Sequence, residues 1–331
     1  MRVGINYPWY SNTFGNHLFT PQALPDFAET LRRLAPRGVS VVRIWLLCQL
    51  DRWGRLVNEG QSPGFCPPQS SDPNPLTEAV DRFVAMLNVC ARFDVQAIPS
   101  LISHDALGDP RRGAGHGGRS AIVTDPEIRS RFFAEVLEPF LVASIQFRPQ
   151  IYAWELMNEP SWNVVNWVVW RHPAFASKLD RQTLVRFLQD GLDRIARAGF
   201  DSTVGHATAS DLDGLPSGTA PQFHYYGLPQ LWVPEQSATR AFVGELSSSR
   251  ARWWPSDPTR VPWPMLLGAD MGDDGKAVLE RLRLLHRQGY SLALLWPEGN
   301  QGPGWTKYSP AALDAVGRFM AQAAATCGRS S

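Results

Sequence analysis

Two glutamates stand where buried strands are expected to end, and each has the chemistry of an acid, a base or a nucleophile. Residues 151–160 read Ile-Tyr-Ala-Trp-Glu-Leu-Met-Asn-Glu-Pro, an apolar run that closes on Asn158 and Glu159 and is stopped by proline. A strand buried on both faces is a nearly continuous apolar run, and a carboxylate at its end needs partners or water. Glu245 lies near the end of a second such run, 241–246. Taken alone, Asn158-Glu159-Pro160 is equally well interpreted as a strand end whose glutamate is simply solvated.

Other polar and aromatic residues also fall at the ends of expected strands. They are Arg43 in the run 39–47, His104 after 95–102, His224 and Tyr226 in 221–226, and Trp296 at the end of 291–296. Singly, a histidine of this kind is interpreted as a core residue, an arginine as a structural charge and a tryptophan as a packing residue. His206, at the end of the weaker strand 203–207, we interpret as structural. The shared position of the others at strand ends is what indicates a site.

The elements that must position these residues alternate along the chain. Strands are expected at 2–8, 39–47, 95–102, 151–157, 203–207, 221–226, 241–246 and 291–296. Helical spacing of apolar residues predicts helices at 26–37, 76–93, 125–147, 179–198, 276–287 and 310–324. Asp125 and Pro126 suit a helix start, whereas 49–75 and 250–264 are rich in loop-forming residues.

This order predicts an α/β fold, a (β/α)8 TIM barrel formed by residues 1–331 as a single catalytic domain with elaborated βα loops. An open doubly wound sheet is the structural alternative. It would be expected to carry a glycine-rich turn after its first strand, but residues 6–10 read Asn-Tyr-Pro-Trp-Tyr.

Composition narrows the classes of function. A formal net charge of +1 provides no broad field for nucleic acid or an anionic membrane, and no apolar run approaches membrane-spanning length. The four cysteines lack metal-type spacing. The glycines of 113–118 do not directly follow a strand, as a phosphate-binding loop requires. We therefore expect no metal, no cofactor, no nucleic-acid partner and no membrane partner. Lack of a signal peptide predicts a cytoplasmic protein, or a secreted one if a signal was removed.

In a barrel of this type the active site lies at the C-terminal ends of the strands. Glu159 and Glu245 would come from the fourth and seventh strands, opposite each other across the mouth. Two carboxylates that flank a glycosidic bond divide the work: one donates a proton to the leaving oxygen and the other attacks the anomeric carbon. The predicted chemistry is glycoside hydrolysis with retention, which requires roughly 5 to 5.5 Å between the carboxyl groups.

The motif set resembles the clan A retaining glycoside hydrolases, most closely the cellulase-like family five. The matching features are Asn158-Glu159-Pro160 after a fourth strand, His-x-Tyr at 224–226, a glutamate ending a seventh strand and a tryptophan after an eighth. The surroundings of Glu245, Gly-Glu-Leu-Ser, fit the family pattern only loosely.

The resemblance implies a role for each site residue. Glu159 would be the general acid/base and Glu245 the nucleophile. Asn158 would hold the substrate 2-hydroxyl, Tyr226 would donate to Glu245, and Arg43 would keep Glu245 ionised. His224 would contact the acid/base, while His104 and Trp296 would line the subsite next to the cleaved bond.

The implied substrate is a β-linked glucan, mannan or related oligosaccharide. Loop tryptophans suit stacking on the apolar face of a sugar, and of these we select Trp9 and Trp162, although a loop tryptophan equally anchors its own loop. Two alternatives remain at this stage: a transglycosylase of the same fold, and a carbohydrate-binding barrel without catalysis. Loss of either glutamate would have favoured the second. A metal-dependent or phosphate-binding barrel enzyme lacks support, because no His-x-His motif appears.

Overall fold

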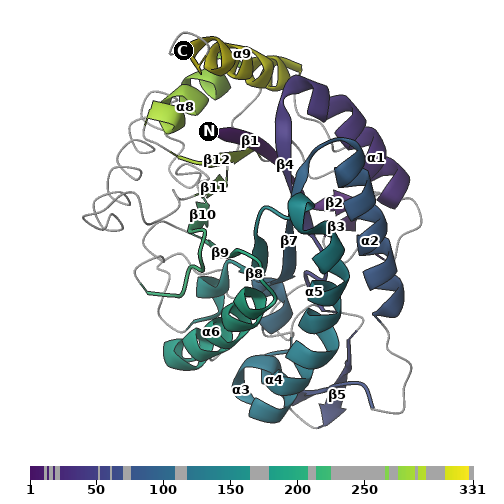
Figure 1. Cartoon of the computed structure of the whole chain (residues 1–331). Coiled ribbons are helices and arrows are strands. Elements are labelled where there is room, and N and C mark those ends of the chain that lie inside the picture. The colour runs from purple at the N-terminus through teal and green to yellow at the C-terminus, as the bar shows by residue number, and fades with distance from the viewer. Residues whose placement is uncertain are drawn as a thin grey trace.

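The computed structural model describes residues 1–10, 13–14, 18, 23–50, 53–59, 62–69, 76–108, 118–164, 179–207, 214–224, 265–267, 275–287, 290–295 and 310–327. Within them, eight parallel strands pair in chain order, and the first also pairs with the last, so the sheet closes on itself (Figure 1). These strands are β1 (Arg2–Tyr7), β4 (Val39–Trp45), β7 (Gln96–Ser103), β8 (Trp154–Asn158), β9 (Ser202–His206), β10 (Gln222–His224), β11 (Met265–Leu267) and β12 (Leu292–Leu295).

Helices cover the outside of the sheet, as the apolar spacing predicts (Figure 1). The α-helices are α1 (Ala23–Leu34), α2 (Thr77–Arg92), α3 (Ala121–Thr124), α4 (Pro126–Phe132), α5 (Glu138–Ser144), α6 (Arg181–Arg197), α8 (Gly275–Arg287) and α9 (Pro310–Cys327). Shorter helical segments are η2 (Ala35–Arg37), η3 (His104–Leu107), η5 (Phe133–Leu137), η6 (Ile145–Gln150) and η7 (Pro160–Asn163). Among the described residues, no helix separates β9 from β10 or β10 from β11.

The helix predicted as one piece over 125–147 is a series of shorter segments. Its start is as expected: the Asp125 side chain accepts hydrogen bonds from the backbone N–H groups of Glu127 and Ile128, and Pro126 occupies the first turn. A π-helical turn, η5, then joins α4 to α5, where Pro139 lies in the first turn. Proline has no N–H to continue an α-helical ladder, which accounts for an irregular turn at this place.

The seventh strand differs from the prediction. β11 pairs with β10 on one side and β12 on the other, so Met265–Leu267 occupies the place expected for 241–246. The latter run, with Glu245, lies outside the described residues. β11 is only three residues long and follows the sequence Val-Pro-Trp-Pro at 261–264. A short apolar run next to prolines carries almost no periodicity, whereas 241–246 has the length and composition typical of a strand.

The stretch 49–75, predicted to be a loop, contains an antiparallel hairpin. Its strands are β5 (Arg55–Glu59) and β6 (Ser62–Cys66). The hairpin is anchored by Trp53, whose ring lies 5.5 Å from that of Phe65 and 5.8 Å from that of Phe132 on α4. A second, shorter hairpin is made by β2 (Trp9–Tyr10) and β3 (Thr13–Phe14).

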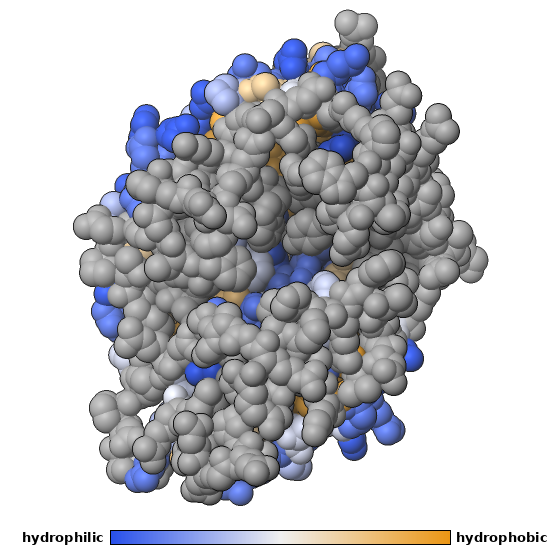
Figure 2. Space-filling model, turned by 180° about the vertical axis from the view of Figure 1, so that it is seen from behind, coloured by the Kyte–Doolittle hydropathy of each residue, from blue (hydrophilic) through white to orange (hydrophobic). Residues whose placement is uncertain are grey.

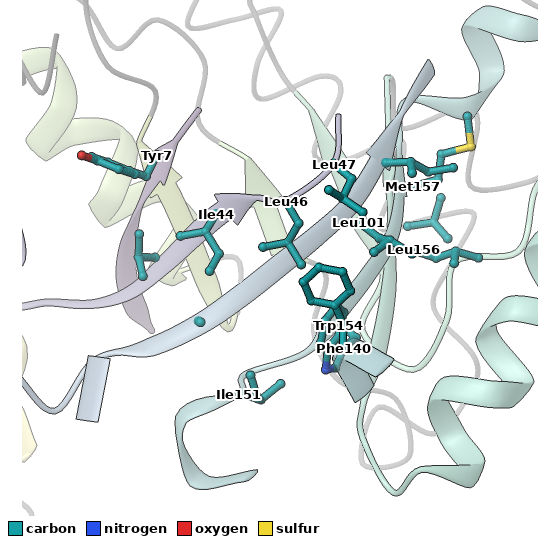
Figure 3. Close-up of a cluster of buried hydrophobic side chains, with 14 of the residues drawn as sticks. Tyr7, Ile44, Leu46, Leu47, Leu101, Phe140, Ile151, Trp154, Leu156 and Met157 are labelled. Atoms are coloured by element: carbon teal, nitrogen blue, oxygen red, sulfur yellow. The ribbon is translucent and has the colours of Figure 1, made fainter. Parts of the chain in front are cut away.

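The main apolar core lies between the sheet and the helices (Figure 3). Phe83 on α2 makes edge-on contacts with Phe140 on α5 and with Trp154 on β8, at ring distances of 5.5 and 5.6 Å. Leu156, also on β8, belongs to the same core. Aromatic edge contacts of this kind add to the free energy gained by burial, so β8 is firmly attached to the helices behind it.

A second cluster fills the inside of the barrel. Its members lie on, or just before, strands spread around the sheet, and side chains from all of these segments can meet only in the interior. They are Val41, Ile98, Ala153, Ala220, Leu292 and Leu294. Side chains on a strand return to the same face every second residue. Two residues further along four of these segments stand Arg43, Ser100, Glu155 and Gln222, all buried. The interior therefore changes from apolar to polar toward the C-terminal ends of the strands.

Candidate active site

A fully buried ion pair forms the floor of the candidate site. Arg43 on β4 donates from Nε and Nη2 to the two carboxylate oxygens of Glu155 on β8, over 2.5 and 2.7 Å. Nη1 of Arg43 donates to Oδ1 of Asn6 over 3.1 Å. A buried ion pair requires good geometry and further hydrogen bonds, and this pair has both. The ion pair therefore fixes the position of the Arg43 guanidinium.

Asn158, the last residue of β8, is held from two sides. Its Oδ1 accepts a hydrogen bond from Nη2 of Arg43 over 2.8 Å, and its Nδ2 donates to Oγ of Ser103 over 3.3 Å. In the sheet, Asn158 is level with Ser103 on β7 and with Gly205 on β9. The ion pair below thus orients the amide at the rim.

Glu159 leaves the sheet through an unusual backbone conformation. Its φ and ψ are 51° and 49°, in the left-handed region, which costs free energy for a residue with a Cβ. The N–H of Glu159 donates to the carbonyl of Gly205 over 2.6 Å, and Pro160 begins η7 immediately afterwards. Strained residues of this kind cluster at functional sites, and here the strain marks the predicted acid/base.

Both carboxyl oxygens of Glu159 have a nitrogen partner. Oε1 lies 2.6 Å from Nδ1 of His224, the last residue of β10. Oε2 accepts from Nε1 of Trp162 over 3.0 Å, and Nδ1 of His104 lies 3.8 Å from the same oxygen. The contact between His224 and this glutamate is the one that the family resemblance implies.

Gln222 determines which nitrogen of His224 carries the proton. Its Nε2 lies 3.1 Å from Oε1 of Glu155 and 3.4 Å from Nε2 of His224. An amide NH2 is a donor, and it must face the Glu155 carboxylate because the amide oxygen would be repelled there. Nε2 of a neutral His224 is then the acceptor, so its Nδ1–H donates to Glu159.

Electrostatics favour an ionised Glu159. Burial alone would raise its pKa, because the charged form loses water. The hydrogen bond from His224, followed by electrostatic interactions with His224, His104 and Arg43, acts in the other direction and prevails, so the pKa of Glu159 lies below its usual value. Burial lowers the pKa of His224, and Glu159 offsets this only in part. Because the two groups touch, they titrate as a pair, and the neutral-pH form is a carboxylate that accepts an N–H.

His104 stands in a polar cluster at the end of β7. Oγ of Ser103 lies 3.2 Å from Nδ1 of His104 and donates to Oδ2 of Asp105 over 2.7 Å. Sγ of Cys48 lies 3.6 Å from the same carboxylate oxygen. Burial, followed by the charge of Asp105, raises the pKa of the Cys48 thiol far above its usual value. Cys48 is thus a protonated thiol and not a nucleophile.

Gly205 on β9 provides the space for the polar groups inside the barrel. A Cβ at this position would lie 2.2 Å from Oε1 of Glu155, and 2.8 Å from Nε2 of both Gln222 and His224. Contacts that short do not occur in folded proteins. The absence of a side chain at Gly205 therefore allows Glu155, Gln222 and His224 to approach one another.

The structure brings together six of the ten predicted site residues: Arg43, His104, Asn158, Glu159, Trp162 and His224. Glu245, Tyr226 and Trp296 lie outside the described residues, as does the side chain of Trp9. The described hydrogen bonds of Arg43 go to Glu155, Asn158 and Asn6, and its expected contact with Glu245 stays a prediction.

Sequence reasoning missed Glu155, Gln222 and Gly205. A signal for Glu155 was present: it is a charged residue inside the apolar run 151–157, as Arg43 is inside 39–47. Two buried opposite charges in one barrel are expected to pair. Gln222 and Gly205 carry no comparable signal, because their importance depends on which residues stand level with them across the sheet.

The described residues contain no group of three or more His, Cys, Asp or Glu placed to hold a metal ion. None of the described helices has the length and apolar character needed to cross a membrane. Hydrophilic residues are visible near the middle of the face shown in Figure 2.

No protein-family model matches the sequence, and no curated protein matches it by sequence comparison. Solved structures do match. The β-mannanase of the blue mussel Mytilus edulis aligns with a TM-score of 0.61 at 16% identity, over 96% of this chain and 91% of its own. The endo-1,4-β-mannanase of Eisenia fetida aligns with a TM-score of 0.64 at 17% identity, over 96% and 90%. A GH5_18 protein of Streptomyces cattleya, solved with GlcNAc, aligns with a TM-score of 0.68 at 16% identity, over 97% and 80%.

This chain has the fold of the family five enzymes. The resemblance inferred from Asn158-Glu159-Pro160 and the histidine of β10 is therefore confirmed at the level of the fold.

Proposed function

We propose that the chain is a retaining β-glycoside hydrolase with a complete (β/α)8 barrel, acting on β-linked mannan or a related β-linked oligosaccharide. One observation carries the proposal. Glu159 stands in a strained conformation at the end of β8, with both carboxyl oxygens bound by ring N–H groups. Beside it, Asn158 is oriented by a buried ion pair. The two hydrogen bonds hold the carboxyl group of Glu159 in one position, as proton transfer to a bound substrate requires.

In the first step a protonated Glu159 gives its proton to the glycosidic oxygen as the bond to the anomeric carbon breaks. A second carboxylate forms a covalent bond to that carbon from the opposite face. In the second step ionised Glu159 removes a proton from water, whose oxygen attacks the anomeric carbon and releases the second carboxylate. The resting Glu159 is ionised, so it must gain a proton when substrate binds. A nearby ionised carboxylate raises the pKa of a carboxyl group and so favours that protonation.

Glu245 is our proposed nucleophile, on the strength of its match to the family motif. A second candidate follows from the strand pairing. β11 occupies the seventh position of the barrel, and the first carboxylate after it in the sequence is Asp270. Catalytic residues of such barrels follow the C-terminal ends of strands, so Asp270 has to be compared with Glu245.

Mannan is the first substrate class to test, because two of the similar structures are named as mannanases. The structure with GlcNAc extends the class to oligosaccharides that contain N-acetylglucosamine. Asn158, oriented by Arg43, would hold the sugar next to the cleaved bond. Tyr226, Trp296, Trp9 and His104 would line the remainder of the site. Neither metal nor organic cofactor enters the proposed reaction.

The proposal is tested with aryl β-mannosides, aryl β-glucosides, β-mannan and β-glucan, following the first-formed anomer by proton NMR. We expect the β-anomer to form first. First formation of the α-anomer would exclude retention, and no turnover of any substrate would exclude the function.

The nucleophile is assigned by comparing Glu245→Gln with Asp270→Asn. A mechanism-based 2-deoxy-2-fluoro glycoside should label the wild-type chain once, and the peptide that carries the label identifies the residue. We expect the label on Glu245. A label on Asp270 would transfer the role to the carboxylate that follows β11.

A further inference from the structure

Trp162 contacts the predicted acid/base in a way that sugar stacking does not require. Its indole Nε1 donates to Oε2 of Glu159 over 3.0 Å. The backbone N–H of Trp162 also donates to the carbonyl of Glu159 over 3.2 Å. The first turn of η7 therefore folds the indole back onto the side chain that precedes it by three residues.

The turn that carries Trp162 is attached to its neighbours. Nδ2 of Asn163 donates to the carbonyl of His104 over 3.0 Å, and Val164 forms a parallel bridge with Leu179. The rings of Trp162 and His104 lie 6.0 Å apart at an angle of 31°. The indole N–H is thus presented by a braced segment and not by a free side chain.

An indole N–H is only a donor and never takes a proton from its partner. A hydrogen bond from it to a carboxyl group is stronger when that group is ionised, so Trp162 favours the charged form of Glu159. The same holds for Nδ1–H of His224 on the other oxygen. Each oxygen of the carboxylate therefore has its own N–H donor.

We propose that Trp162 is a positioning residue that acts through Glu159, holding Oε2 and stabilising the carboxylate that exists after proton transfer to the leaving group. The inference rests on the proposed function and adds a role to a residue otherwise expected only to stack on sugar. In the first step the bonding electrons stay on the leaving oxygen, which takes the proton of Glu159. The negative charge then appears on the carboxylate next to the indole N–H. In the second step that carboxylate regains a proton from water.

Other charged and titratable groups also face this carboxyl and stay unchanged in the test. His224 comes from β10 and His104 from η3, with Asp105 beyond it. Arg43 approaches through Asn158, and Glu155 lies behind Arg43. A change confined to the indole N–H therefore isolates a single interaction.

Two variants remove the N–H while keeping an aromatic face. Trp162→Phe is the simpler one. Replacement of Trp162 by 3-benzothienylalanine keeps the two-ring shape and substitutes sulfur for the N–H. Trp53→Phe is a matched control, because Nε1 of Trp53 donates to Oε2 of Glu135, also over 3.0 Å, away from the site.

The measurement is the pH dependence of kcat/KM for an aryl β-mannoside, whose alkaline limb reports the ionisation of the acid in the free enzyme. Loss of the N–H raises the pKa of Glu159, so we expect the alkaline limb to move upward by roughly one pH unit in both Trp162 variants. KM should stay within about twofold, since the aromatic face remains. Trp53→Phe should leave the limb in place. An unmoved limb in both Trp162 variants would overturn the inference.

A second readout does not depend on activity. In chain labelled with 13C at glutamate carboxyl carbons, the resonance absent from Glu159→Gln belongs to Glu159, and its titration gives the pKa directly. We expect a higher pKa in the 3-benzothienylalanine variant than in wild type, and an equal pKa would overturn the inference. Absence of turnover in wild type would instead contradict the proposed function, so the two failures are distinguishable.

Discussion

Arg43 on β4 and Glu155 on β8 form a bidentate ion pair that is fully buried inside the barrel. The guanidinium also reaches Asn158, the residue immediately before the predicted acid/base. The pair therefore joins the interior of the barrel to the rim where catalysis is proposed. Glu155 has no access to solvent, but through Arg43 and Asn158 it can influence the proposed reaction at Glu159.

Glu155→Gln should both destabilise the chain and reduce activity. The substitution leaves a buried guanidinium without its counter-charge, a change that costs on the order of 3–5 kcal/mol. It also frees Arg43 to move away from Asn158, so kcat/KM should fall by at least about tenfold. Urea unfolding and steady-state kinetics measure the two effects. Glu135→Gln is the control, because its ion pair with Arg131 is partly exposed and such pairs contribute about 1 kcal/mol or less. Equal stability losses in the two variants would contradict the assigned role of Glu155.

Gly205→Ala should disturb the site by steric conflict alone. The new methyl group would approach Oε1 of Glu155 to 2.2 Å, and overpacking of this kind costs about 1–3 kcal/mol. Gly317→Ala is a matched control on α9, where the nearest atom to the added Cβ is the carbonyl oxygen of Arg37 at 4.0 Å. Alanine in a helix is about 1 kcal/mol better than glycine, so Gly317→Ala should be neutral or stabilising. Thermal unfolding of both variants measures these changes in stability. An unchanged Tm in Gly205→Ala would refute the packing argument.

Gln222→Met should release the tautomer of His224 without removing a charge. Methionine has a similar shape but offers no N–H to Nε2 of His224, which is 3.4 Å from the amide nitrogen in the native chain. We expect 15N NMR of the imidazole to show a mixture of tautomers where wild type shows mainly the Nδ1–H form. kcat should fall while the fold is kept. Gln189→Met, on the exposed face of α6, serves as the control and should change neither quantity.

Much of the fold could be predicted because it depends on patterns that are local in sequence. The β-branched run of β4, the helix start at Asp125 and Pro126, and the polar end of β8 each reflect a backbone preference acting over a few residues. The seventh strand could not be predicted, because Met265–Leu267 is too short to show a period. It is defined by its partners β10 and β12.

The candidate site likewise contains residues whose position could be predicted from the sequence and residues whose position could not. Glu159, Asn158 and His224 were found because strand ends meet at one rim of a parallel barrel. Gln222 and Gly205 could not be predicted, because their roles depend on the lateral register of strands that are distant in sequence. Glu155 differs from them, because a charged residue inside the apolar run 151–157 is a signal that the sequence does contain. Trp162 was found for its aromatic face, whereas its N–H contact depends on the left-handed conformation of Glu159.

His206 should make the chain sensitive to acid. It is fully buried, and neither ring nitrogen has a hydrogen-bond partner in the described part of the chain. Burial, followed by the electrostatic interaction with His224, lowers its pKa to about 3. The unfolded chain takes up this proton below about pH 6.5, whereas the folded chain resists it until about pH 3. The contribution of His206 to the free energy of unfolding is therefore fully present above about pH 6.5 and is lost as the pH falls toward about 3.

His206→Leu should remove this part of the acid sensitivity. At about 1.4 kcal/mol per pKa unit, the contribution amounts to a few kcal/mol at most. We expect the variant to be as stable as wild type at pH 7 or more so, because an unpaired polar ring is replaced by an apolar side chain. Between pH 6.5 and 3.5 its free energy of unfolding should fall less steeply. Parallel curves for the two proteins in urea titrations across this range would show that His206 does not carry the effect.

The central claim is that Glu159 is the acid/base of a retaining glycosidase, and chemical rescue of Glu159→Ala tests it most directly. Turnover of an aryl β-mannoside with a poor leaving group should fall by at least about 10² to 10⁴, the usual range for loss of acid–base catalysis. With a dinitrophenyl leaving group, which needs no protonation, azide should restore turnover and yield the β-glycosyl azide. That product requires an intact nucleophile and an intermediate that azide can attack. Unchanged hydrolysis by Glu159→Ala, or an α-azide product, would contradict the mechanism.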